Sequence, residues 1–353
     1  MATNFQEIKQ MTLLDYSKQE LVEYVEKLGF PKFRGSQLFD ALVQGKKLED
    51  ITTLPKDLKE KVKDDYPNFE IVKKLESSDG TKKYVFKFKD GEIVESVFMK
   101  YKYGNTLCVS TQVGCRMGCK FCASGLYGLK RNLSAGEILE QIVAVNKDNG
   151  GDTKHRQVTN VVLMGSGEPL DNYDNVTKFF KLVMMEEGLN ISQRNISIST
   201  CGIVPNIYKL ADDGFSVTLT ISLHASNDEV RRQTMPIANK YSIDEILKAC
   251  KYYFDKTGRR VIFEYTLVSG VNDKMEHVQE LSKILRGFSC HVNVIPLNYV
   301  KERGLKGSPI KLAHEFAQKL TDLGISATVR RTLGADIGGA CGQLRNKIME
   351  ENG

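Results

Sequence analysis

The sequence predicts an α/β protein built on a parallel sheet, preceded by a small helical domain and a β-meander. Two observations support this prediction. Beyond residue 104, strand-like and helix-like stretches alternate, and alternating units of this kind form a parallel sheet that is either doubly wound or curved into a barrel. Before that region, the apolar pattern changes from a helical period to a strand period near residue 68.

Residues 1–67 are expected to form a helical accessory domain. Between about residues 12 and 65, apolar residues lie three or four positions apart, as they do on one face of a helix. Pro31, Gly35 and Pro55 are expected to divide this stretch into short helices, because proline and glycine interrupt helical structure.

Residues 68–100 are expected to form a β-meander that links the helical domain to the main domain. The turn sequences Ser78-Asp79-Gly80 and Lys89-Asp90-Gly91 flank an alternating stretch, and a second alternating stretch, Ile93–Met99, follows. A charged residue in an alternating strand normally faces solvent, so this pattern predicts an exposed Glu95.

The main domain is predicted over residues 101–345. The pairs Ser134 with Glu137 and Ser242 with Glu245 have the capping-box spacing that starts a helix. The predicted strands are Thr106–Val113, Asn160–Met164, Ile196–Thr200, Val217–Leu223, Val261–Val268, Val292–Leu297 and Ala327–Arg331. The helices expected between them include Ser134–Lys147, Ser242–Lys256, Met275–Arg286 and Ile310–Leu323.

Three cysteines, Cys115, Cys119 and Cys122, form a C-x3-C-x2-C run directly after the first of these strands. Thiolates this close together suit one polynuclear metal centre better than a disulfide framework. They can hold a [4Fe–4S] cluster whose fourth iron has no protein ligand and is open to a small molecule. The alternative is a structural zinc site completed by a distant Cys or His, although such sites usually repeat a C-x2-C pair and this sequence has no second pair.

Glycine-rich and polar segments follow other predicted strands, at the carboxyl ends where α/β enzymes place their chemistry. These segments are Gly165–Pro169, Ser199–Gly202, Ser222–Ala225 and Asn298. We therefore expect them to converge with the cysteine run on one site.

The composition is that of an ordinary globular protein. The first thirty residues lack an unbroken apolar run and no later stretch reaches transmembrane length, so a cytoplasmic protein without membrane contact is expected. Eight cysteines then indicate reduced thiols and metal ligands. The net charge of +6 makes nucleic acid a reasonable partner, with basic clusters at Lys100–Lys102, Lys130-Arg131, Arg231-Arg232, Arg259-Arg260, Lys301–Lys306 and Arg330-Arg331.

The cysteine run, with the turn Gly167-Glu168 after the next strand, resembles the radical S-adenosylmethionine (SAM) superfamily. The resemblance implies a partial (β/α)6 barrel and a [4Fe–4S] cluster that binds SAM and breaks one of its C–S bonds by electron transfer. Over nearly the whole chain, further motifs resemble the RlmN family, whose members methylate adenine at C2 in 23S rRNA and in tRNA. These motifs are Met164–Leu170, Ser199–Gly202, Ser222–Asn227, Ile295–Asn298, Val329–Thr332 and Ala340–Leu344.

The RlmN resemblance implies roles for individual residues. Cys115, Cys119 and Cys122 match the cluster ligands. Cys341 matches the cysteine that carries the methyl group, Cys108 its resolving partner and Glu95 the general base. The positions that match SAM contacts are Gly167, Glu168, Ser199, Ser222, Leu223, His224 and Asn298. One departure is Ser166, where the family commonly has Met.

The implied reaction uses two SAM molecules per turnover. One SAM methylates Cys341, and the radical from the second removes a hydrogen from the S-methyl group, so that the methylene adds to C2 of the adenine. Glu95 then removes the C2 proton, and Cys108 attacks Cys341 to release the product and leave a transient disulfide. Glycines around Cys341 favour a mobile segment.

The implied partners are the peptidyl transferase centre of 23S rRNA, the adenine 3′ to the anticodon of tRNA, and an electron donor such as flavodoxin or ferredoxin. Because C2 is hard to reach in a stacked pair, a single-stranded or flipped adenine is expected, and the N-terminal domain and basic clusters are candidates for holding RNA. A monomer is expected.

Two alternatives remain open. The antibiotic-resistance type of enzyme methylates C8 of the same rRNA adenine and shares the cluster and both cysteines. Pro169 argues against it, because that type usually has Ala after the Glu of this turn. The other alternative is a non-catalytic RNA-binding protein with a structural metal.

Overall fold

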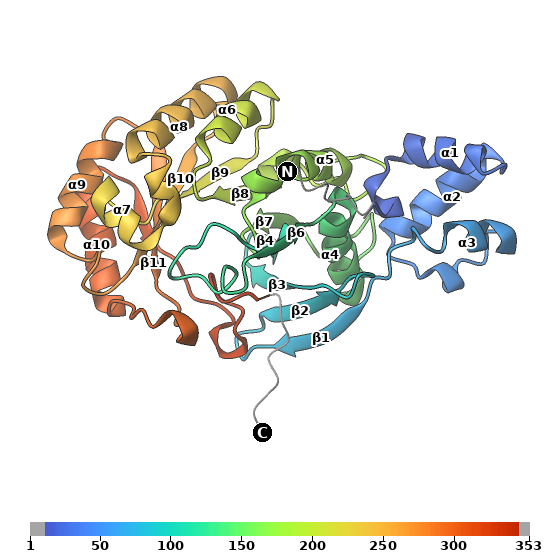
Figure 1. The fold of residues 1–353 in the computed structure, drawn as a ribbon, viewed down its shortest axis with the longest axis horizontal. Helices are drawn as coiled ribbons and strands as arrows, with labels where there is room; N and C mark the ends of the chain where they lie inside the picture. The colour runs from blue at the N-terminus through green and yellow to red at the C-terminus, as the bar shows by residue number, and fades with distance from the viewer. Residues whose placement is uncertain (1–10, 346–353) are drawn as a thin grey trace, which may run out of the picture.

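The computed structural model describes residues 11–345, which form a larger α/β lobe and a smaller helical lobe (Figure 1). The main sheet has ten strands, and their order in the chain is also their order in the sheet. They are β1 (Ile71–Glu76), β2 (Lys82–Lys87), β3 (Ile93–Tyr101), β4 (Gly104–Cys108), β7 (Asn160–Leu163), β8 (Ile196–Thr200), β9 (Thr218–Ser222), β10 (Val261–Leu267), β11 (Cys290–Pro296) and β12 (Ala327–Val329).

Neighbouring strands pair antiparallel from β1 to β4 and parallel from β4 to β12. The α/β prediction is therefore confirmed, and the sheet is open, with β1 and β12 at its two ends. The predicted meander is continuous with the parallel strands, because β3 and β4 pair from Tyr101 with Gly104 to Val97 with Cys108.

The single strand predicted over Thr106–Val113 was wrong. The chain leaves the main sheet after β4 and then forms β5 (Gln112–Gly114), which pairs with β6 (Leu129–Asn132) in a separate two-stranded sheet. The cause is Gln141, whose side-chain amide accepts a hydrogen bond from the Ser110 N–H (2.9 Å) and donates one to the Ser110 carbonyl (3.0 Å). These bonds replace the ladder at Ser110 and turn the following residues toward β6.

Helices cover the outer face of the parallel strands, as Figure 1 shows. They are α4 (Ala135–Asp148), α5 (Tyr173–Val183), α6 (Val204–Asp212), α7 (Asp228–Thr234), α8 (Ile243–Thr257), α9 (Met275–Leu285) and α10 (Ile310–Asp322). Both predicted capping boxes are present, at Ser134 before α4 and at Ser242 before α8. None of the described helices is long and apolar enough to cross a membrane.

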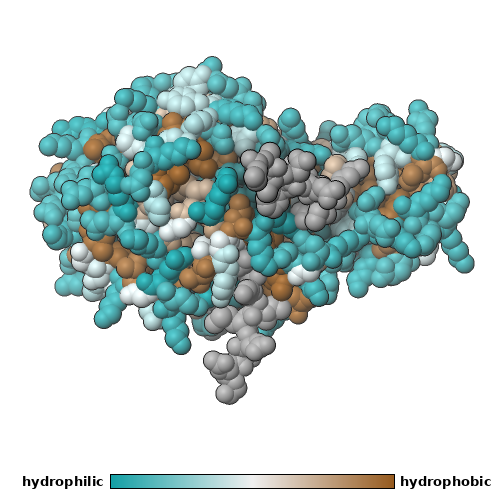
Figure 2. Space-filling model, in the orientation of Figure 1, coloured by the Kyte–Doolittle hydropathy of each residue, from teal (hydrophilic) through white to brown (hydrophobic). Residues whose placement is uncertain are grey.

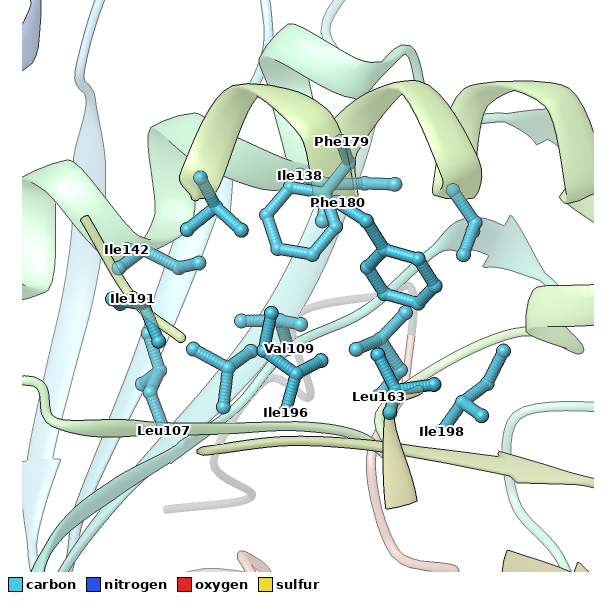
Figure 3. Packing of buried hydrophobic residues seen from close by; sticks show 14 of the residues in the cluster. Leu107, Val109, Ile138, Ile142, Leu163, Phe179, Phe180, Ile191, Ile196 and Ile198 are labelled. Carbon is cyan, nitrogen blue, oxygen red and sulfur yellow. The ribbon is translucent and has the colours of Figure 1, made fainter. Parts of the chain in front are cut away.

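Buried aliphatic and aromatic side chains join these helices to the sheet. Figure 3 shows Ile138 of α4 and Phe179 and Phe180 of α5 facing Val109 and Ile196 beneath them. Hydrophilic residues cover most of the molecular face in Figure 2, and apolar residues appear among them in the middle of the larger lobe. Burial of apolar area of this kind supplies most of the driving force that holds α/β layers together.

The helical lobe consists of α1 (Lys18–Lys27), α2 (Lys32–Val43) and α3 (Lys56–Val62). The expectation that Gly35 separates two helices was wrong, because Gly35 lies inside α2. A Cβ at Gly35 would lie 2.5 Å from the Cα of Val22, so this glycine allows the backbones of α1 and α2 to approach closely. Asp15, which precedes α1, accepts a hydrogen bond from the Gly136 N–H at 2.7 Å in the first turn of α4, and this bond ties the helical lobe to the larger lobe.

Candidate functional site

The carboxyl ends of the parallel strands and the cysteine run surround one cavity of about 890 Å³. Its wall includes all three cysteines of the run and most of the residues that the sequence singled out at the strand ends: Cys115, Cys119, Cys122, Gly167, Glu168, Ser199, Ser222, His224 and Asn298. The structure therefore brings these residues together from five separate segments of the chain.

The three cysteines of the run are only partly exposed. Burial raises the pKa of the Cys115 thiol to about 12 and that of Cys119 well above its usual range, and the sulfur of Cys122 acts in the same direction. Thiols in such a place become thiolates most readily when a metal centre takes the proton's position. Among residues 11–345, no three His, Cys, Asp or Glu side chains are arranged to hold a single metal ion. The three cysteines line one cavity, and three thiolates can serve as ligands to separate irons of one cluster.

The turn after β7 is held tightly by Gln112. Gly167 has a φ of +109°, and a Cβ there would lie 2.6 Å from the Cβ of Gln112. The Gln112 amide oxygen accepts a hydrogen bond from the Glu168 N–H at 2.8 Å. The Glu168 carboxylate is buried and accepts from the main-chain N–H groups of Cys201 (2.7 Å) and Leu170 (3.0 Å). Burial raises the pKa of Glu168, and the hydrogen bond from Cys201 opposes that effect.

Glu264 is a site residue that the sequence reasoning missed. It lies in the middle of β10, lines the cavity, and accepts a hydrogen bond from the Ser199 hydroxyl at 3.1 Å. The Ser222 hydroxyl lies 3.5 Å from the same oxygen, and the other oxygen is paired with Arg330 at 2.7 Å. The available signal was a lone carboxylate inside the otherwise uncharged run Val261–Leu267.

His224 lies in the cavity wall as a neutral imidazole. Its Nδ1 accepts a hydrogen bond from the Thr266 N–H at 2.9 Å, so the ring proton is on Nε2. Burial lowers the pKa of His224 to about 3, and the positive charge of Arg231 acts in the same direction. The ring packs edge-to-face against Phe121 in the cysteine loop. The side chain of Leu223, by contrast, is buried in the hydrophobic core and is not among the residues that line the cavity.

Cys341 lines this cavity and also a second one of about 530 Å³. The second cavity is lined by Cys108 and Arg330 as well, so the two cysteines predicted to pair face a common space. Burial raises the pKa of Cys108 to about 12 and also raises that of Cys341, whereas the Arg330 guanidinium favours both thiolates. Asn298 holds the thiol segment by donating to the Cys341 carbonyl at 3.0 Å.

The expectation that Glu95 is exposed was wrong, because its side chain is buried. One carboxylate oxygen is paired with Lys83 at 3.0 Å, and the other accepts a hydrogen bond from the Arg345 N–H at 2.7 Å. Glu95 lines a third cavity, together with Tyr299 and other residues, and is not among the residues that line either cavity of Cys341.

Comparison with known proteins gives consistent matches. Residues 109–282 match the model of the radical SAM superfamily. Two curated proteins named probable dual-specificity RNA methyltransferase RlmN cover 96% of this chain. The one from Clostridium botulinum (strain Eklund 17B) is 52% identical and is itself covered to 97%, and the one from Clostridium novyi is 50% identical and covered to 99%.

A solved structure also matches almost throughout. The crystal structure of a radical SAM methyltransferase from Sphaerobacter thermophilus aligns with a TM-score of 0.90 and 40% identity, over 96% of this chain and 100% of the other. The full-length similarity, the superfamily match and the three cysteines on one cavity agree. The chain therefore belongs to the RlmN family of radical SAM RNA methyltransferases.

Proposed function

We propose that this enzyme methylates C2 of an adenine in the peptidyl transferase centre of 23S rRNA and of the adenine 3′ to the anticodon in tRNA. The proposed route uses two SAM molecules per turnover and an S-methyl group on Cys341. The observation that supports it best is that Cys341 lines two cavities, one with the cysteine run and one with Cys108. A thiol at that junction can receive a methyl group on one side and be attacked by a second thiol on the other.

Cys115, Cys119 and Cys122 would hold a [4Fe–4S] cluster, which when bound supplies one electron to SAM and so a carbon-centred radical. SAM would contact the cavity that these cysteines line, at Gly167, Glu168, Ser199, Ser222, His224 and Asn298, together with the main chain of Leu223. Because His224 is neutral, it can donate its Nε2–H there without placing a second positive charge near the SAM sulfonium.

Glu95 would remove the C2 proton, and Cys108 would resolve the RNA adduct by attacking the Cys341 sulfur. The carboxylate of Glu95 is occupied by Lys83 and by the Arg345 N–H, so it can reach an adenine only after the segment around residues 338–345 moves. Gly338 and Gly342 have φ values of +60° and +80°, and glycines allow such a segment to change conformation at low cost.

The substrate would be an unpaired adenine. Tyr103, Tyr127 and Tyr299 are exposed, and exposed aromatic rings are surfaces on which single-stranded bases stack. We propose that the helical lobe, α1 to α3, helps to hold the RNA, that the enzyme acts as a monomer, and that a flavodoxin or ferredoxin delivers the electrons; residues 1–10 of the predicted N-terminal domain lie outside the described residues.

The test is anaerobic reconstitution with iron and sulfide, followed by turnover with SAM and a reductant on separate rRNA and tRNA fragments. A brown protein that produces 5′-deoxyadenosine and 2-methyladenosine in both RNAs would support the proposal. Detection of 8-methyladenosine by mass spectrometry would instead show the C8 reaction. A colourless protein that binds only zinc would overturn the radical mechanism for this chain.

A further inference from the structure

Arg231 is a fully buried cation in α7, although the sequence grouped it with surface basic clusters. Its guanidinium donates hydrogen bonds to four main-chain carbonyls: Cys201 at 2.6 Å, Leu223 at 3.1 Å, Ser222 at 3.3 Å and Tyr241 at 3.4 Å. Within residues 11–345, no carboxylate oxygen lies within 4.0 Å of its guanidinium, although Asp228 acts on it from a greater distance. The hydrogen bonds of the Arg231 guanidinium within this part of the chain therefore all go to neutral main-chain carbonyls.

Such an arrangement is costly unless a negative charge completes it. Removing an ion from water is costly even after relaxation, and carbonyl dipoles recover only part of that cost. Burial accordingly lowers the pKa of Arg231, and the thiols of Cys201 and Cys119 act in the opposite direction. The carboxylate of Asp228, at the start of α7, also raises the pKa of Arg231.

The cysteine loop packs directly on the segment that carries Arg231. The Lys120 N–H, between two cysteines of the run, donates to the carbonyl of Thr234, the last residue of α7, at 2.9 Å. A Cβ at Gly118 would lie 3.5 Å from Pro236, which begins the short 3-10 helix Pro236–Asn239 that follows. Two residues whose carbonyls bind Arg231, Cys201 and Ser222, line the cavity that holds the cysteine run. The cation therefore lies behind the cavity wall, in the segment on which the cysteine loop packs.

We propose that Arg231 is a positioning residue whose buried charge stabilises the negatively charged three-thiolate cluster and raises its reduction potential. This inference rests on the proposed cluster site. A [4Fe–4S] centre with three thiolates is already an anion, and one electron from an external low-potential donor adds a further negative charge to it. A cation in a low-dielectric wall favours that reduced form, because the attraction grows with the charge of the cluster.

A purely structural role is the competing explanation, since three of the four hydrogen bonds also join the ends of β8 and β9 to α7. Two variants distinguish an electrostatic role from a structural one, because they change the charge and the hydrogen-bonding geometry independently. Arg231→Gln removes the charge, whereas Arg231→Lys keeps the charge but cannot reproduce the planar fork that reaches several carbonyls. Lys120→Gln is a matched control, because it removes an exposed positive charge from the cysteine loop itself, where water screens it.

The experiment is an anaerobic redox titration of each reconstituted variant, followed by electron paramagnetic resonance of the reduced cluster, with iron content and thermal stability measured in parallel. We expect Arg231→Gln to lower the potential by at least about 59 mV, a tenfold change in the one-electron equilibrium constant. Arg231→Lys is expected to lose thermal stability while its potential stays close to that of the parent protein, and Lys120→Gln is expected to shift the potential much less than Arg231→Gln.

A potential that does not change in Arg231→Gln, or one that falls equally in Arg231→Lys, would overturn the inference in favour of the structural role. If Arg231→Gln does not fold, the test rests on Arg231→Lys. A change in the reduction potential of that variant together with its loss of stability would contradict a charge effect, because lysine keeps the positive charge. Failure of the proposed function is distinguishable, because the parent protein would then give no cluster signal at all.

Discussion

Arg330 and Glu264 form an ion pair at 2.7 Å that lies between the two cavities of Cys341. Glu264 lines the cavity of the cysteine run, and Arg330 lines the cavity that contains Cys108. The same carboxylate accepts a hydrogen bond from the Ser199 hydroxyl at 3.1 Å. Glu264 therefore connects Arg330, in the wall of one cavity, to Ser199, in the wall of the other.

Removing one partner of this buried ion pair should destabilise the protein more than removing one partner of an exposed ion pair. We expect Glu264→Gln to lower the free energy of unfolding by about 2–3 kcal/mol, because it leaves the largely buried guanidinium of Arg330 without this counter-charge. Arg330 is still partly exposed, so the loss should be smaller than for a fully buried pair. Denaturant titration measures the loss. The control is Lys248→Met, which removes the exposed pair with Asp244 and should cost less than about 0.5 kcal/mol.

A side chain at Gly167 should disrupt the turn after β7. Gly167→Ala combines a positive φ with a contact of 2.6 Å to Gln112, so we expect a loss of about 2–3 kcal/mol and weaker SAM binding. Gly214→Ala is the matched comparison, because Gly214 also has a positive φ but has no atom within 4 Å of the added Cβ. It should cost about 1 kcal/mol and leave SAM binding unchanged. Equal effects of the two substitutions, by calorimetry of SAM binding and by thermal unfolding, would contradict the crowding argument.

The burial of His224 makes stability depend on pH in the acid range. Its folded pKa of about 3 lies below the unfolded value of 6.5, so between these pH values the unfolded state binds the additional proton. Stability from this group is therefore complete above pH 6.5 and is lost as the pH falls toward 3. At pH 5 the loss should be about 2 kcal/mol.

His224→Gln removes this titration and keeps a polar side chain. The difference in unfolding free energy between pH 7.5 and pH 5 should therefore be smaller in the variant than in the parent protein by that amount. Parallel pH dependences in the two proteins would show that His224 is not held neutral in the folded state.

Substitutions of the two proposed catalytic cysteines should block different steps of the reaction. Cys341→Ala should take up no methyl group from labelled SAM and give no methylated RNA. Cys108→Ala should accept the methyl group and then stall after addition, so that RNA stays covalently attached to the protein on a denaturing gel. Cys250→Ala is the control, because Cys250 is buried in α8 away from both cavities and its loss should leave product formation intact. Recovery of only free RNA from Cys108→Ala would contradict the resolving role.

Local sequence determined the periodic elements and the cysteine run of this protein. Strand period, capping boxes at Ser134 and Ser242, and the C-x3-C-x2-C spacing depend on residues a few positions apart, so they can be interpreted without a fold. The convergence of strand ends on one cavity also followed from sequence, because parallel strands present their carboxyl ends at the same edge of a sheet.

The tertiary structure decided which charged and polar groups are buried, and with what partners. The partners of Glu95, Glu264 and Arg231 come from segments remote in sequence, as do the Gln141 amide that ends β4 and the Val22 backbone that requires Gly35. From residue type alone, a charged side chain is expected to face solvent, because its burial is costly. The hydrogen bonds and counter-charges that offset this cost exist only once distant segments pack together.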